Sequence, residues 1–188
     1  MKKEKSVQPV TTIRFTAKLL RPAVPPTGET WNFLVLPLDA SAQLPTRSMT
    51  TVEGTLNGQP FQATLEPDGR KSHWLKAPRA LCEAARAVPG DLVALEISPV
   101  QKEPEPKVPT ALRNALAAAP KATAVWSSLT PIARRDWIHW ITSAKQEETR
   151  VRRIGTACDM LAAGKRRACC FDRSGFYSKS MCAPEAAP

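Results

Sequence analysis

An Asn-Gly pair, Asn57-Gly58, stands between two segments in which apolar and polar residues tend to alternate, residues 51–56 and 59–65. The type I′ turn of a two-residue β-hairpin needs positive φ at both central positions, which Asn and Gly tolerate best. The sequence therefore predicts an antiparallel hairpin. Gly54, inside the first of its strands, indicates a bulge or a close approach of another backbone. A hairpin needs further strands or a helix to bury its apolar face.

Further segments of the first half supply those partners. Strand patterns cover residues 11–20, 31–39, 72–76 and 91–100. In the last of them Val93, Leu95 and Ile97 share the face that we expect to point inward. Residues 78–88 have helix composition, with Pro78 in the first turn and Val88 on the apolar face. Five to seven short strands with one helix favour a small β-barrel over a parallel α/β sheet.

The second half has helical rather than strand periodicity. Thr130-Pro131 is typical of a helix start. Trp137, Trp140, Ile141 and Ala144 follow at helical spacing and form one apolar face. A second long helix is expected after a break near residues 145–146, ending at Gly164. Together the two halves predict an α+β protein.

The domain organisation follows from these patterns. We expect a flexible arm over residues 1–10, a β-barrel domain over 11–100, a stiff proline-rich linker over 101–109, a helical domain over 110–167 and a partly disordered tail over 168–188.

The formal net charge of +10 is unevenly distributed. Residues 1–108 hold 14 Lys and Arg against 11 Asp and Glu, whereas residues 109–170 hold 11 against 4. Such a surplus favours anionic partners, including nucleic acid, anionic lipid and anionic metabolites.

The remaining composition narrows the chemistry. The 5 cysteines have no CxxC spacing and lie far from both histidines, so we predict no metal site and no cofactor. We expect no secretory signal and no membrane span, because no apolar run of sufficient length is present, and we place the protein in a reducing cytoplasm. No phosphate-binding loop, metalloprotease or serine-hydrolase motif occurs, which lowers the expectation of an enzyme.

Basic side chains of the helical half are the candidates for binding an anion. The candidate site consists of Arg134, Arg135, Lys145, Arg150 and Arg153. Arginine forks match phosphate and carboxylate geometry, and Arg150 and Arg153 share a helix face. The competing interpretation is structural: these arginines pair internally with Asp136, Glu148 or the carbonyl end of a helix. We likewise weigh base stacking by Trp126, Trp137 and Trp140 against a place in the core, and favour the core.

The chain also resembles two families. Residues 13–98 resemble the domain of unknown function 1905 family, at Phe15-Thr16-Ala17, Trp31, the stretch from Val52 to Phe61 and Gly90-Asp91-Leu92-Val93. Residues 108–167 resemble the YdeI/OmpD-associated, or bacteriocin-protection, family, at Val108-Pro109, Arg134-Arg135-Asp136-Trp137, Trp140-Ile141, Glu148-Thr149-Arg150, Arg153-Ile154 and Gly164-Lys165-Arg166. The resemblance implies a double-split β-barrel akin to AbrB-like barrels, followed by a helical part. It implies no established activity.

Three functions stay open at this point. The leading hypothesis is a non-enzymatic module that binds nucleic acid or a small anion through its basic helical face. The second is a scaffolding role with the arginines paired internally. The third is an enzyme with a pocket between barrel and helices that uses Lys145 or His73.

Overall fold

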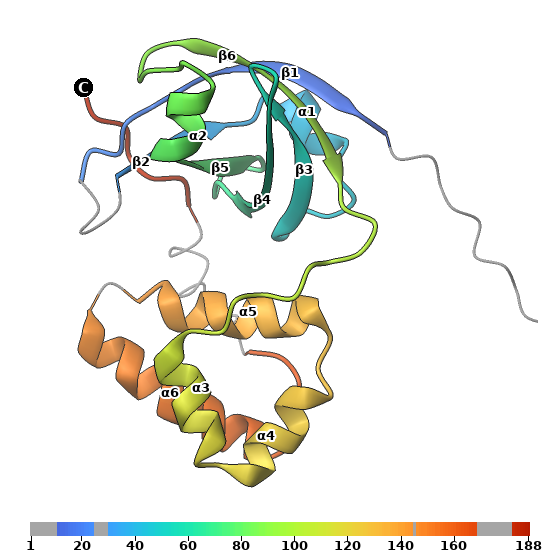
Figure 1. Ribbon diagram of the computed structural model, residues 1–188, viewed down its shortest axis with the longest axis vertical. Coiled ribbons are helices and arrows are strands. Elements are labelled where there is room, and N and C mark those ends of the chain that lie inside the picture. The colour runs from blue at the N-terminus through green and yellow to red at the C-terminus, as the bar shows by residue number, and fades with distance from the viewer. Residues whose placement is uncertain (1–10, 25–29, 145, 169–181) are drawn as a thin grey trace, which may run out of the picture. The chain divides into compact units, whose positions relative to one another are not determined.

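The computed structural model describes residues 11–24, 30–144, 146–168 and 182–188. Contacts divide these residues into two compact units. The first unit contains the described residues up to Gln101 together with residues 182–188. The second unit contains the described residues from Lys102 to Ala168. Figure 1 shows strands in the first unit and helices in the second, as the sequence patterns predict.

The first unit is built on a curled six-stranded sheet in the order β1-β6-β3-β4-β5-β2. Its elements are β1 (Ile13–Lys18), β2 (Trp31–Val35), α1 (Leu38–Ala42), β3 (Thr50–Leu56), β4 (Gln59–Pro67), β5 (His73–Pro78), α2 (Arg79–Ala84) and β6 (Leu92–Pro99). All strand pairs are antiparallel. Leu20 and Phe33 exchange main-chain hydrogen bonds of 2.7 and 2.9 Å, which join the chain just after β1 to β2. The expected α+β class, a barrel-like sheet followed by helices, is confirmed.

Alternation along the strands explains the core of this unit. In β6, Val93, Leu95 and Ile97 are buried, as predicted, and the residues between them are exposed. Ile13 of β1 lies opposite Ile97 and is buried as well. Leu56, at the end of β3, is completely buried in the same cluster.

The predicted hairpin is present. Asn57 and Gly58 have φ values of 47° and 81°, and the register runs without a break from Leu56 opposite Gln59 to Thr50 opposite Leu65. Gly54 marks a close approach and not a bulge. A Cβ atom added there would meet the carbonyl oxygen of Glu96 and lie 2.8 Å from the Cα of Ile97. Only glycine allows β6 to lie this close to β3.

Two local predictions were wrong. The strand expected over 31–39 ends at Val35, and a short helix, α1, begins at Leu38, so the first unit has two helices instead of one. The helix expected over 78–88 ends at Ala84, because Arg86 adopts a φ of 50°, which no helix continues. Val88 is consequently 62% exposed and does not join the apolar face.

The second unit contains four helices in its described residues: α3 (Thr110–Ala117), α4 (Pro120–Ser127), α5 (Pro131–Thr142) and α6 (Glu147–Ala162). The hydroxyl of Thr130 accepts a hydrogen bond from the backbone N–H of Ala133 and caps α5 as expected. Gly164 follows α6 with a φ of 82°. Trp137 is fully buried at the centre of the core, which Leu112 and Leu161 complete.

The end of the chain lies against the first unit. The N–H of Ala23 donates to the carbonyl of Glu185 at 2.7 Å, and the N–H of Ala187 donates to the carbonyl of Arg21 at 2.8 Å. The N–H of Ala183 donates to the backbone carbonyl of Asp68 at 3.2 Å. Residues 169–181, the larger part of the expected tail, lie outside the described residues.

Candidate functional site

Arg134, the first member of the candidate site, holds three intramolecular acceptors. Its guanidinium donates to the carboxylate of Glu105 at 2.7 Å and to the carbonyls of Trp126 and Ser127 at 3.2 and 2.8 Å. These two carbonyls end α4, where the helix macrodipole is negative. Arg134 therefore joins the end of α4, the start of α5 and the segment that precedes α3.

Arg135 forms the most enclosed ion pair among those described. It contacts Glu103 at 2.7 Å and Asp136 at 3.3 Å. The side chains of Arg135 and Glu103 are 14% and 12% exposed. Burial raises the pKa of the Asp136 carboxyl above its ordinary value of 3.8, while the charge of Arg135 acts in the opposite direction. We expected the segment that contains Glu103 to be a linker. This ion pair fastens it to α5.

Arg153 continues the same pattern at the next helix end. It donates to the carbonyl of Trp140 and, at 3.2 Å, to the hydroxyl of Ser143, which ends α5. Arg166 binds the end of α4 through the carbonyl and hydroxyl of Ser128, at 2.6 and 2.9 Å. Arginines thus serve as C-terminal caps for neighbouring helices in this unit.

Arg150 is held less tightly than the other three described candidates. It pairs with Glu147 one turn earlier at 2.9 Å, and the two side chains are 40% and 74% exposed. Its Nε atom is buried and meets no hydrogen-bond acceptor among the described residues. The indole N–H groups of Trp137 and Trp140 are also buried and have no hydrogen-bond acceptor among the described residues. Lys145, the remaining candidate, lies outside the described residues.

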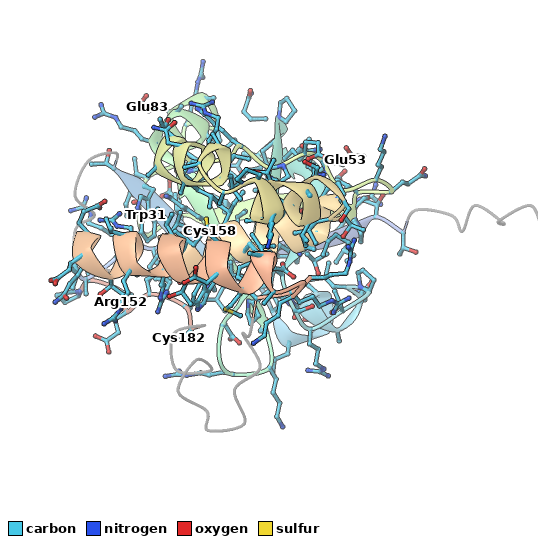
Figure 2. The ribbon with its side chains drawn as sticks, turned by 90° about the horizontal axis from the view of Figure 1, so that it is seen from below. Trp31, Glu53, Glu83, Arg152, Cys158 and Cys182 are labelled. Carbon is cyan, nitrogen blue, oxygen red and sulfur yellow. The ribbon has the colours of Figure 1, made fainter. Side chains whose placement is uncertain are left out.

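Arg152 lies on another side of the same helix. It is exposed, and no carboxylate among the described residues lies within ion-pair distance of its guanidinium. Figure 2 shows Arg152 and Cys158 on opposite sides of α6. Cys158 packs against the core, and burial raises the pKa of its thiol. Arg152 therefore carries a charge that the fold does not use.

The three tryptophans of this unit belong to the core, as we favoured. Trp126, Trp137 and Trp140 are 8%, 0% and 9% exposed. The rings of Trp137 and Trp140 meet edge to face with centroids 5.9 Å apart. Rings buried to this extent are not open to stacking with bases.

A cleft in the first unit was not predicted from the sequence. It has a volume of about 1250 Å³ and lies between β4 and the end of β5, next to α2. Trp31, Phe61, Lys76 and Leu81 are among its lining residues. Its existence depends on how far β4 and β5 separate, for which the sequence contains no local signal.

Two family models match the chain, one in each unit. The model described as Domain of unknown function (DUF1905) matches residues 15–97. The model described as Bacteriocin-protection, YdeI or OmpD-Associated matches residues 105–164. The chain joins a DUF1905 module to a YdeI/OmpD-associated module. No curated protein matches the sequence.

In these terms, the arginine contacts lie in the YdeI/OmpD-associated module and the cleft lies in the DUF1905 module. Sequence reasoning missed Glu103 and Glu105 as partners of the arginines. Both carboxylates belong to a proline-rich segment that directly precedes the basic domain, and its composition predicted a linker and no contact with a helix. The role of the candidate arginines in anion binding stays a prediction.

His73 of the DUF1905 module, the histidine of the enzyme hypothesis, is enclosed and satisfied. Its Nε2 lies 3.1 Å from the carbonyl of Ser48, and its Nδ1 lies 2.8 Å from the hydroxyl of Ser41. Since the carbonyl can only accept, Nε2 carries the proton and Nδ1 accepts from Ser41. His73 is 1% exposed and does not line the cleft.

Other chemistry is limited in the part of the chain that the structure describes. No group of three or more His, Cys, Asp or Glu side chains there is placed to hold a metal ion. No helix among these residues has the length and apolar character to cross a membrane.

Proposed function

We propose that the protein is a non-enzymatic binding protein that holds a small phosphate- or carboxylate-bearing anion beside α5 and α6 of its YdeI/OmpD-associated module. Arg150 and Arg153 are the contacting residues in this proposal. Lys145, the further cation of the candidate site, stands between the two helices in sequence and lies outside the described residues. Arg134 and Arg135 shape the module and have no direct contact with the anion, because their guanidinium groups hold α4, α5 and the segment before α3 together.

The observation that supports this proposal is a surplus of donors. The Nε of Arg150 and the indole N–H groups of Trp137 and Trp140 are buried without an acceptor among the described residues. Each unsatisfied buried donor costs about 1–3 kcal/mol. An anion that accepts from the Nε of Arg150, or from the indole N–H of Trp140 next to Arg153, removes part of that cost and gains charge-assisted hydrogen bonds.

The exposure of Arg150 adds to the argument. A guanidinium that is 40% exposed and paired with a carboxylate that is 74% exposed is weakly held, since such surface pairs contribute only about 0–1 kcal/mol. An incoming anion can replace Glu147 at little cost. Arg153, one turn further along α6, keeps its bonds to the end of α5 and presents its charge from a fixed position.

The test is a titration of the full chain with inorganic phosphate and with pyrophosphate, followed through the indole N–H signals in NMR spectra. We expect the indole N–H signal of Trp140, which lies beside Arg153, to shift with saturation. Arg150→Ala should weaken binding about tenfold or more, the equivalent of one charge-assisted hydrogen bond. Absence of binding at low salt, together with unchanged indole signals, would falsify the proposal.

Arg152→Ala is the matched control, because it removes the same charge from another side of the same helix. We expect it to change the phosphate affinity by less than about twofold. Equal losses in the two variants would indicate a diffuse electrostatic attraction in place of a site.

Nucleic acid is the second candidate partner, and it is favoured by the 11 basic against 4 acidic residues over positions 109–170. An oligonucleotide arm of the same titration separates the two candidates. Two results would favour nucleic acid. The logarithm of the affinity would fall linearly with the logarithm of the salt concentration, with a slope of about −0.7 to −0.9 for each phosphate contacted. Arg150→Ala and Arg152→Ala would also weaken binding equally.

A further inference from the structure

The two sides of β4 are paired to very different extents. On one side β4 pairs with β3 along seven positions, from Gln59 opposite Leu56 to Leu65 opposite Thr50. On the other side it pairs with β5 at two positions, Glu66 with Trp74 and Pro67 with His73. Within the described residues, positions 59–64 of β4 therefore have a strand neighbour on one side only. Figure 1 shows β5 leading away from β4 beyond this shared end.

The register determines which backbone groups face the open side. The carbonyl of Thr51 in β3 and the N–H of Asn57, directly after β3, bond to the β6 side. The even-numbered residues of β3 consequently face β4, since successive residues point their backbone groups in opposite directions. Their partners in β4 are odd-numbered, so residues 60, 62 and 64 face outward. Gln62 and Thr64 each present one free donor and one free acceptor, and Pro60 presents only an acceptor.

The cleft runs along this edge. Its lining includes every residue from Gln59 to Thr64. Side chains of successive strand residues point to opposite faces of a sheet, so a cavity that touches all of them lies beside the strand and not over one face. The stretch from Pro60 to Thr64 is about 14 Å long. Lys76 and Pro78 of β5 and the helix α2 form the opposite wall.

The side chains of the cleft combine apolar surface with a lysine, Lys76, that contacts an aromatic ring. Phe61 and Leu81 are partly buried and supply apolar contact on the core side. The Nζ atom of Lys76 lies 5.1 Å from the centre of the Trp31 ring. No carboxylate of the described residues pairs with Lys76, whereas Arg79 is bonded to Glu83 at 2.6 Å.

We propose that this cleft binds an extended peptide segment of a partner protein, which adds as a strand beside β4. The peptide exchanges main-chain hydrogen bonds with Gln62 and Thr64, places an apolar side chain against Phe61 and Leu81, and places a carboxylate opposite Lys76. This site belongs to the DUF1905 module and is independent of the anion site proposed for α5 and α6.

The backbone geometry is what selects a peptide. Donor and acceptor groups that repeat at every second residue along a straight edge match an extended main chain and no compact metabolite. Open edges are usually blunted by proline, charge or a covering element. Here Pro60 removes one donor at the start of the edge. The next two outward-facing residues, Gln62 and Thr64, keep their N–H donors.

The experiment selects peptides of about twelve residues from a random display library on the full chain, a length sufficient to span the edge. The probes are the enriched peptides themselves, made synthetically and measured by fluorescence anisotropy. The decisive variant is Gln62→Pro, which removes the outward N–H and leaves the bonds to β3 in place. Gln62→Ala is its control, because it removes the side chain and keeps the N–H.

We expect Gln62→Pro to weaken binding about tenfold or more and Gln62→Ala to change it less than about threefold. Lys76→Glu should weaken the binding of acidic peptides in the same manner. The amides of Gln62 and Thr64 should exchange rapidly with solvent in the free protein and slowly in the complex, which is a readout that does not depend on how any variant folds.

Several outcomes overturn the proposal. One is a selection that enriches no peptide, and another is an enriched peptide that leaves exchange at Gln62 and Thr64 unchanged. A concentration-dependent dimer that protects the same two amides without peptide would assign the edge to a second copy of this chain. Loss of phosphate binding in Arg150→Ala has no bearing on this site, so the two proposals fail separately.

Discussion

Arg153 donates a hydrogen bond to the carbonyl of Trp140, and its guanidinium carbon lies 5.4 Å from the centre of the indole ring of the same residue. One side chain of α6 thus satisfies the backbone at the end of α5 and covers the aromatic residue beneath it. The arrangement makes Arg153 a packing residue as well as a charge, because a guanidinium stacks on an aromatic face more readily than an ammonium does.

Replacement of Arg153 should therefore cost stability. We expect Arg153→Ala to lower the free energy of unfolding by about 2 kcal/mol, because the hydrogen bonds of a charged donor are lost. Chemical denaturation followed by circular dichroism measures the change. Arg152→Ala, on the same helix but without such contacts, should stay within about 0.5 kcal/mol of the wild type. Equal effects would contradict the capping role of Arg153.

The pair between Arg135 and Glu103 should behave as a unit. Arg135→Met leaves the carboxylate of Glu103 enclosed without its partner, and we expect a loss of about 3 kcal/mol in the free energy of unfolding. The double variant Arg135→Met with Glu103→Met should recover part of that loss, since two apolar side chains replace two charges. A double-mutant cycle measures the coupling between the positions. Strictly additive losses would argue against a direct pair.

Strand alternation, the Asn57-Gly58 turn and the start of α5 at Thr130 were predictable because each depends on residues close together in sequence. Pairing of the arginines with Asp136 and with helix ends was weighed from the sequence, but their contacts with Glu103 and Glu105 were not. Arg135 and Glu103 are 32 residues apart, and a proline-rich segment gives no indication that it packs against a helix. The cleft beside β4 could not be predicted from the sequence either, because it exists only since β4 and β5 pair at two positions and then separate. Local patterns specify elements, while long-range pairing decides which charges remain available.

Two glycines provide a test of close packing. Gly54→Ala should lower the free energy of unfolding by more than about 3 kcal/mol, because its Cβ would collide with the backbone of β6. Gly155→Ala should have the opposite sign. Gly155 lies inside α6 with no atom within 4 Å of an added Cβ, so alanine should stabilise the helix by about 0.5–1 kcal/mol. Thermal unfolding of both variants measures these changes in stability. A Gly54→Ala protein as stable as the wild type would exclude the close approach of β3 and β6.

Burial lowers the pKa of His73 below its ordinary value of 6.5, although the hydrogen bond to Ser48 and the charge of Asp68 act in the opposite direction. The unfolded chain then binds a proton at a higher pH than the folded chain does. Between the lowered pKa and 6.5, the free energy of unfolding must therefore rise with pH. The contribution of His73 to stability is complete above pH 6.5, and it is lost as the pH falls through the pKa of the folded state. NMR titration of the ring protons should give a midpoint below 6.5. In His73→Gln the corresponding part of the pH dependence should disappear, whereas His139→Gln should retain it. A His73 midpoint at or above the ordinary value would show that the ring is not enclosed between Ser41 and Ser48.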